Sequence, residues 1–179
     1  MIHYSSPFSL EKDLGKAYNQ AISLIPDNDW ICFTDGDTLF LTSDYGKQLQ
    51  EIVDLHPNTG LFTCITNRVG QKQQCYNNTI SEDPNILNHR RIALQIQREK
   101  RHQVKPLNIV ISGHLMLIKK SVWKEVGGFP EGTGLLAVDN KFSSRILRAH
   151  KQILLMEGVY LFHYYRLLEG SHDKSHLLV

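Results

Sequence analysis

The sequence predicts an α/β fold, because short apolar runs alternate along its first half with segments of helical periodicity. The apolar runs are too short for buried helices and are therefore expected to be strands. The 179 residues suffice for one domain with a sizeable core. Hydrophobic residues make up 41% and charged residues 21% of the chain, an ordinary globular balance. We therefore interpret residues 1–179 as a single domain.

The first half of the chain contains five expected elements. Strands are expected at three runs, 2–4, 30–34 and 61–65. A helix over 9–25 separates the first two strands, with Ser9 as its cap and Leu10 at the start of its inward stripe. A second helix, capped by Ser43 or Asp44, precedes the third strand. Strand, helix, strand, helix, strand is α/β order.

The second half is less regular. A long polar loop is expected over 67–85 and a basic helix over 86–105. Ser112-Gly113-His114 interrupts an apolar stretch, and Ser121 can cap a short helix after it. A further helix is expected over 139–149, two strands that form a hairpin or one bent strand around Gly158, and a flexible tail over 169–179.

Two carboxylates stand at the end of the second apolar run. Asp35-Gly36-Asp37 directly follows the strand expected at 30–34. Carboxylates at i and i+2 beside a buried strand are costly to leave unpaired, and a divalent cation or a bound hydroxyl would resolve that cost. Gly36 permits close approach of backbone or ligand. The alternative interpretation is a simple turn, because Asp-Gly is a common turn pair.

The segment 86–105 carries six basic residues and a single acid, Glu99. It is interpreted either as a solvated helix face or as a contact for an anionic acceptor, a diphosphate or a membrane surface. The net charge of +2 does not by itself indicate nucleic acid. Neither aromatic interleaving nor a known reader motif supports nucleic-acid binding, which is not expected.

Cysteine use and hydropathy bear on location. Cys32, Cys64 and Cys75 lack metal-ligand spacing, and the first two lie in apolar runs typical of buried free thiols. This fits a reducing compartment. The longest apolar runs are too short for a transmembrane helix, and the first residues lack a signal segment. We expect a cytoplasmic protein with peripheral contact to the inner face of the membrane through 86–105.

Five stretches together resemble the family 2 glycosyltransferases. Leu14–Ala21 is similar to the family's G-x-A-x-x-N helix, and Trp30–Asp37 to its D-x-D strand. Ser112–Glu131 resembles the stretch that ends in G-G-F-D-E, Val138–Asn140 the E-D motif, and His163 the late metal-binding histidine. The match covers roughly residues 10–165, in the family's order and at sensible spacing.

The resemblance implies a GT-A-like mixed sheet flanked by helices, and a metal-dependent glycosyltransferase of the inverting type. Asp37 and Asp35 would bind the metal, with His163 as a third ligand, and Mn²⁺ or Mg²⁺ is the implied cation. Asp139 would be the catalytic base. Donor-binding roles would fall to Asp35 and three further residues, Lys16, Asn19 and His114. The implied partners are a UDP- or GDP-type sugar donor and a glycan or glycolipid acceptor.

The chain departs from the family pattern in three ways. Only nine residues precede the first expected helix, so the Rossmann-like nucleotide half is shortened. Val138 replaces the first acid of the E-D motif, and Lys141 stands where a second acid often follows. The loops at 67–85 and 131–137 are the expected places for substrate choice, because specificity lies in loops.

Two other functions are kept open. A catalytically degenerate glycosyltransferase-like domain would bind a sugar or depend on a partner, which the shortened half and Val138 would explain. A phosphatase of the haloacid dehalogenase type is the remote alternative, since Asp35–Leu39 superficially resembles that family's D-x-D-x-T start. In that case Asp35 would become phosphorylated. The stretch departs from the phosphatase pattern in two ways, because Thr38 comes one position early and a full helix precedes the motif.

Overall fold

The computed structural model describes residues 1–164, so the expected tail at 169–179 lies outside the described residues. The strands are β1 Ile2–Ser5, β2 Trp30–Thr34, β3 Thr38–Phe40, β4 Leu61–Thr66, β5 Val104–Pro106, β6 Leu115–Lys119 and β7 Ile153–His163. The helices are α1 Leu14–Ser23, α2 Tyr45–Leu55, α3 Ile86–Lys100, α4 Lys120–Glu125 and α5 Val138–Arg148. Two short 3₁₀ turns, η1 Lys72–Gln74 and η2 Tyr76–Asn78, lie within the long polar loop.

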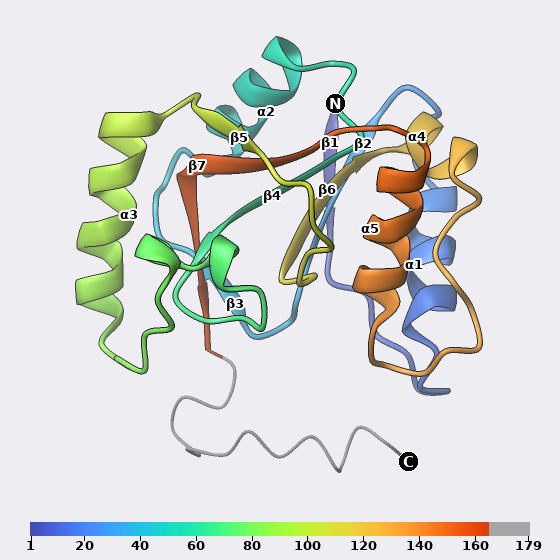
Figure 1. Cartoon of the computed structure of the whole chain (residues 1–179), viewed down its shortest axis with the longest axis horizontal. Coiled ribbons are helices and arrows are strands. Elements are labelled where there is room, and N and C mark those ends of the chain that lie inside the picture. Colours follow the sequence, from blue (N-terminus) through green and yellow to red (C-terminus); the bar gives the residue numbers. More distant parts are fainter. Residues whose placement is uncertain (165–179) are drawn as a thin grey trace.

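The strands form one mixed sheet flanked by helices, as the sequence predicts (Figure 1). The strand order is β1-β2-β6-β4-β7-β3, and β5 pairs with β7 outside this path. β1 is parallel to β2 and β4 is parallel to β7, whereas β6 runs antiparallel to both β2 and β4. The described residues therefore form a single α/β domain, in which β2 lies between the edge strand β1 and the central strand β6.

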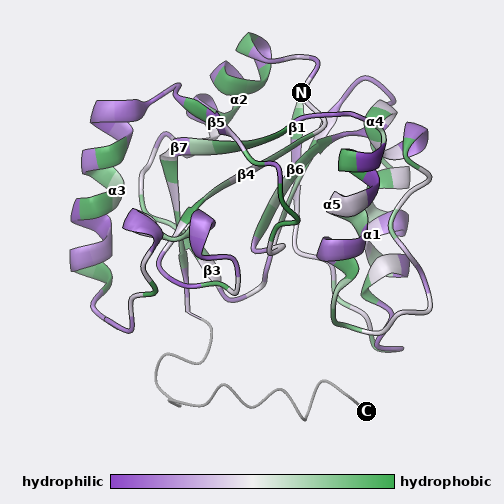
Figure 2. Ribbon diagram, viewed as in Figure 1, coloured by the Kyte–Doolittle hydropathy of each residue, from purple (hydrophilic) through white to green (hydrophobic). Residues whose placement is uncertain are grey.

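Alternation along the strands divides the core between the two faces of the sheet. On β2, Ile31 and Phe33 pack with α1, α4 and α5, whereas Trp30 and Cys32 pack with α2 on the other face. Successive strand side chains point to opposite faces, so a strand buried on both faces is apolar throughout. Figure 2 shows this hydrophobic character on β4 and β6. Cys32 and Cys64 are buried and free, as expected, and Cys75 is buried and free as well.

The last strand is one bent strand rather than a hairpin (Figure 1). Its register against β4 shifts between Cys64, which pairs with Met156, and Ile65, which pairs with Tyr160. Gly158 lies in the extra segment, where an added Cβ would come 2.3 Å from the carbonyl oxygen of Lys100. The glycine thus permits the close approach of α3, and the bend directs the end of β7 towards β3.

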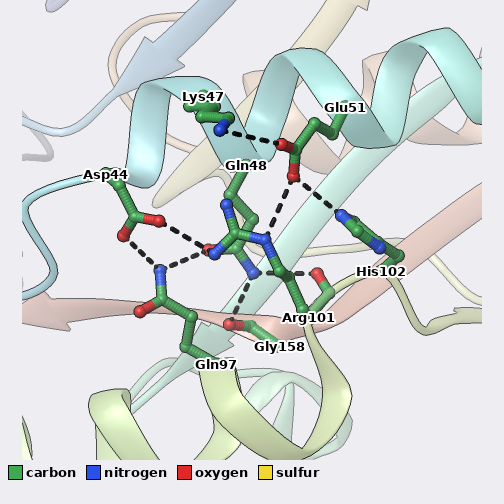
Figure 3. A network of polar contacts seen from close by, with 8 residues as sticks. All are labelled: Asp44, Lys47, Gln48, Glu51, Gln97, Arg101, His102 and Gly158. Carbon is green, nitrogen blue, oxygen red and sulfur yellow. Dashed lines mark hydrogen bonds and ion pairs between the residues drawn. The ribbon is translucent and has the colours of Figure 1, made fainter.

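A polar network joins α2 to α3 and to the bend of β7 (Figure 3). The Arg101 guanidinium contacts Asp44 at 2.8 Å and Glu51 at 3.1 Å. Beneath it, the buried Gln48 amide donates to the carbonyl oxygens of Arg101, at 2.8 Å, and Gly158, at 3.0 Å. At the bend, a side chain rather than a strand partner therefore satisfies the carbonyl oxygen of Gly158.

Two expected helix boundaries are wrong. The first helix begins at Leu14, not at Ser9, because the Asp13 side chain caps it by accepting from the backbone N–H of Lys16. Leu10 therefore lies outside the helix and is 88% exposed instead of inward. The basic helix ends at Lys100, and 104–106 form β5. Pro106 favours extended backbone in the residue before it, which suits a strand.

Two further elements refine the expectations. Ser121 does not cap α4, which begins one residue earlier, at Lys120. β3 was not expected as a strand, because its three residues are set by pairing with β7 rather than by their own pattern. In residues 1–164, no helix combines the length and apolar character needed to cross a bilayer.

Candidate functional site

A cavity of ≈ 630 Å³ opens at the carboxyl end of β2. Asp35 and Asp37 enter it from the turn after β2, and His163 enters it from the end of β7. The loops that contribute to its wall include 69–71 and 135–137, which belong to the two segments expected to govern substrate choice. Asp139 and His114 also line it. The cavity thus collects most of the site residues expected from the sequence.

Local hydrogen bonds shape the acidic turn. The Thr38 hydroxyl donates to the carbonyl oxygen of Asp35 at 2.6 Å, and the Asp35 N–H donates to the carbonyl oxygen of His114 at 3.3 Å. The Tyr164 N–H donates to the carbonyl oxygen of Asp37 at 2.9 Å. The backbone of the turn is therefore held by β6 on one side and by the end of β7 on the other. Both carboxylates remain directed to the cavity.

His163 brings a ring nitrogen to the two carboxylates. Its Nε2 lies 3.4 Å from Asp37 Oδ1 and 3.7 Å from Asp35 Oδ2. One ligand atom from each of the three residues lies within 4.8 Å of the others. The other ring nitrogen of His163, Nδ1, lies 3.0 Å from the carbonyl oxygen of Arg68. In the neutral ring Nδ1 therefore donates to this oxygen, and the lone pair of Nε2 faces the two carboxylates.

This donor set fits a divalent cation. Two carboxylate oxygens and one neutral imidazole nitrogen are ligands that suit Mn²⁺, and carboxylates alone suit Mg²⁺ equally well. In the neutral ring, the contact between Nδ1 and the Arg68 carbonyl oxygen favours the tautomer whose Nε2 can ligate a cation. Asp35, Asp37 and His163 could therefore hold a metal ion, and their metal-binding roles stay predictions.

The two carboxylates differ in acidity. Burial raises the pKa of Asp35 to about 6; the His163 charge opposes this rise, and Asp37 and Asp139 add to it. Burial also acts to raise the pKa of Asp37, but the hydrogen bond and charge of His163, with a backbone hydrogen bond, outweigh it and hold that pKa below its usual value. Asp35 is the carboxylate whose charge has the less favourable surroundings, and a cation would relieve it.

Asp139 is fixed at the first turn of α5. Its Oδ2 accepts from the Gly113 N–H at 2.7 Å, and its Oδ1 accepts from the Asn140 N–H at 2.8 Å. A Cβ on Gly113 would lie 2.8 Å from the Asp139 Cβ, so only glycine allows this approach. Val138, which replaces an acid of the family motif, is 1% exposed and packs in the core beside the cavity.

His114 is a buried ring in the cavity wall. Its Nε2 lies 3.2 Å from the carbonyl oxygen of Cys64, and its ring stacks on that of His163 with centroids 6.3 Å apart. Burial lowers the pKa of His114 to about 3, and the His163 charge lowers it further in the same direction. The ring is therefore neutral at physiological pH. Within residues 1–164, its Nδ1 makes no hydrogen bond of ordinary geometry.

Lys16 and Asn19 lie outside the wall of this cavity. The Lys16 ammonium pairs with Glu11 at 2.8 Å. The Asn19 amide accepts from the Trp123 ring N–H and from the Phe129 N–H, both at 2.8 Å, and donates to the Phe129 carbonyl oxygen at 3.0 Å. Their donor-binding roles stay predictions, and the observed contacts of Asn19 are structural.

Two stretches of the family resemblance contact each other. A Cβ on Gly15 would come 1.8 Å from the carbonyl oxygen of Pro130, and Asn19, one turn later on α1, holds Phe129. Gly15 and Asn19 of α1 thus pack against the turn at 127–131 and hold it by hydrogen bonds to Phe129. Their similarity to the family has a packing reason that does not require a ligand.

Sequence reasoning missed two residues that hold the site together. The Asn67 amide accepts from the His163 N–H at 2.7 Å and donates to its carbonyl oxygen at 2.9 Å, as a neighbouring strand would. The Gln74 amide pairs in the same manner with the backbone of Ser112. The only sequence signal for Asn67 is that it directly follows β4. Gln74 lies among the polar residues of a loop and gives no signal.

The arrangement combines three side chains that could hold a cation with a fixed carboxylate in one cavity. Such a site can bind a diphosphate through a cation and can accept a proton from a bound hydroxyl.

In comparisons with known proteins, no protein-family model and no curated protein matches the chain.

Proposed function

We propose that the protein is a metal-dependent glycosyltransferase of the inverting type, which moves a sugar from a nucleotide-diphosphate donor to a hydroxyl of a glycan or glycolipid. The observation that carries the proposal is the convergence of Asp35, Asp37 and His163, within 4.8 Å, in a cavity that Asp139 also lines. The mixed sheet with the acidic turn at the end of β2 supports the GT-A fold that the family resemblance implies.

The reaction needs two services from this site. Negative charge builds on the diphosphate leaving group, and a bound divalent cation supplies Lewis-acid stabilisation of that charge. Asp35, Asp37 and His163 are the residues that would hold the cation. The acceptor oxygen forms a bond to the anomeric carbon while the bond from that carbon to the diphosphate breaks, and the hydroxyl proton passes to a carboxylate.

Asp139 is the residue suited to take that proton. Two backbone N–H groups fix its carboxylate at the start of α5. General-base assistance contributes about 10²- to 10⁴-fold to such reactions. His114 lines the same wall as a neutral, buried ring.

The test is turnover by the wild type and by Asp139→Asn. A panel of UDP- and GDP-sugars is incubated with Mn²⁺ and glycan or glycolipid acceptors, and released nucleotide diphosphate is measured. The proposal predicts product in the wild type and a kcat about 10²- to 10⁴-fold lower in Asp139→Asn, with unchanged nucleotide affinity. Asp54→Asn on α2, whose carboxylate is exposed and accepts from Gln50, is the matched control and should behave as wild type.

Two outcomes would contradict the proposal. Transfer at the wild-type rate in Asp139→Asn would show that Asp139 is not the catalytic base. Hydrolysis of a simple phosphate ester with a phosphorylated Asp35 intermediate would instead assign the phosphatase chemistry considered above.

A further inference from the structure

The outward face of α3 carries large apolar side chains in the open. Leu87 is 63% and Leu94 is 48% exposed, while the opposite side of the helix buries Ala93 and Ile96 against β7. Figure 2 shows hydrophobic and hydrophilic residues alternating along this helix. Leu87, Arg91, Leu94 and Arg98 follow the spacing i, i+4, i+7 and i+11, so they form one line along the helix.

The arginines on this face have little to bind within the protein. In the part of the chain that the structure describes, Arg90 and Arg91 are exposed and make neither a side-chain hydrogen bond nor an ion pair. Arg98 is 80% exposed and contacts its neighbour Glu99 at 3.9 Å. One residue past the end of the helix, Arg101 is bound by Asp44 and Glu51 instead. The guanidinium of Arg101 is therefore bound within the fold, whereas those of Arg90, Arg91 and Arg98 are exposed to solvent.

This combination fits the surface of a bilayer. A guanidinium pairs with phosphate oxygens through two parallel hydrogen bonds, and its aliphatic stem lies along apolar surface while the charge stays in the headgroup layer. Leucines on the same helix face then lie at the boundary of headgroups and acyl chains. A protein partner would favour apolar residues gathered into one central patch, whereas here arginines separate them.

We infer that the outer face of α3, defined by Leu87, Arg90, Arg91, Leu94 and Arg98, binds the surface of membranes rich in anionic phospholipid. The arginines contact lipid phosphates, and the two leucines enter the headgroup layer. The inference does not rest on the proposed function, because it needs neither a cation nor a nucleotide.

The experiment is flotation of the full chain with phosphatidylcholine vesicles, made with and without about 30% phosphatidylglycerol. Binding is expected only with the anionic lipid and should fall as NaCl rises to about 0.5 M, because salt screens the arginines. Arg90→Gln with Arg91→Gln should lower the partition coefficient about 25-fold, taking about fivefold for each arginine at a charged surface. Leu87→Ser with Leu94→Ser should lower it about tenfold or more at unchanged charge.

A charge-matched control separates this face from general attraction. Lys141 and Arg148 are exposed on α5, which lies on the far side of the molecule from α3 (Figure 1). Lys141→Gln with Arg148→Gln removes the same net charge and should leave the partition coefficient within about twofold. Equal loss in this control, equal binding to pure phosphatidylcholine, or displacement by inorganic phosphate alone would overturn the inference. Circular dichroism checks that each variant is folded.

Discussion

At the scale of single residues, the charge of Asp35 is unfavourable to the metal-free fold. Burial raises its pKa to about 6 from 3.8, so the folded state prefers the protonated form. The resulting stabilisation is fully present below about pH 4 and is lost as pH rises through about 6. The side chain is 39% exposed, which reduces the effect through solvent screening.

Asp35→Asn should therefore stabilise the protein when cations are removed. In EDTA at about pH 8, we expect unfolding free energy to rise by about 1 kcal/mol and Tm by about 2–4 °C. Near pH 4 the gain should vanish, because the wild-type carboxyl is then protonated. Addition of Mn²⁺ should raise the Tm of the wild type but not of the variant. Thermal unfolding across this pH range measures the effect, and a variant less stable than wild type at about pH 8 in EDTA would refute it.

Gly113→Ala should displace Asp139. The added Cβ would lie 2.8 Å from the Asp139 Cβ and would disturb the 2.7 Å hydrogen bond from the Gly113 N–H. We expect a loss of about 1–3 kcal/mol in urea unfolding. Gly36→Ala is the matched control, because an added Cβ there has no neighbour within 4 Å. Equal stability of Gly113→Ala and the control would show that the close approach is not required.

Some residues of the candidate site could be predicted from the sequence, and others could not. Asp35 and Asp37 could be identified because they stand two residues apart directly after an apolar strand. His163 stands far along the chain and could be proposed only from the family resemblance. Asn67 gave no usable signal, because it bonds the His163 backbone on the β4 side of β7, beyond the end of β4, and that need arises only from the folded sheet.

At the scale of elements, burial decides which contact between α2 and α3 matters most. Gln48 is 1% exposed and satisfies two carbonyl oxygens, whereas the Arg101 side chain is 30% exposed and its ion pairs are partly screened. Loss of the buried amide leaves acceptors without partners, which costs more than loss of a solvated ion pair.

Urea unfolding should therefore rank three variants in this network. Gln48→Leu should cost about 2 kcal/mol, Arg101→Leu about 1 kcal/mol, and Lys47→Ala, whose ion pair is 3.9 Å long and 75% exposed on the lysine side, close to zero. If Arg101→Leu cost more than Gln48→Leu, the exposed charges would be the main link between these helices.

The predicted and missed elements differ in what determines them. Strands β2 and β4 and the α2, α3 and α5 helices could be predicted, because their periodicity and length are properties of the segment itself. β3 and β5 have three residues each, and pairing with β7 determines both. The start of α1 was misplaced because Ser9 and Asp13 are both suitable caps. In the structure, the Ser9 hydroxyl instead accepts from the Asp13 N–H.

At the scale of the whole molecule, the candidate site depends on the bend in β7 and on the pairing of its end with β3. The bend in β7 carries His163 out of the register it would have in a straight strand and places it against β3, where Thr38 is its partner. Strand order and this register shift lie beyond local patterns, because they follow from contacts between distant segments. The α/β class, in contrast, depends on the alternation of elements and could be predicted.

The measurement that tests the central claim most directly is calorimetric titration of UDP and GDP, each with and without Mn²⁺. It is performed on the wild type, on Asp37→Ala and on the control Asp54→Asn, with circular dichroism to establish folding. The account predicts that at least one nucleotide binds only with Mn²⁺, that Asp37→Ala abolishes this binding, and that Asp54→Asn retains it. Binding that ignores Mn²⁺ or survives in Asp37→Ala, or absence of binding to both nucleotides, would contradict it.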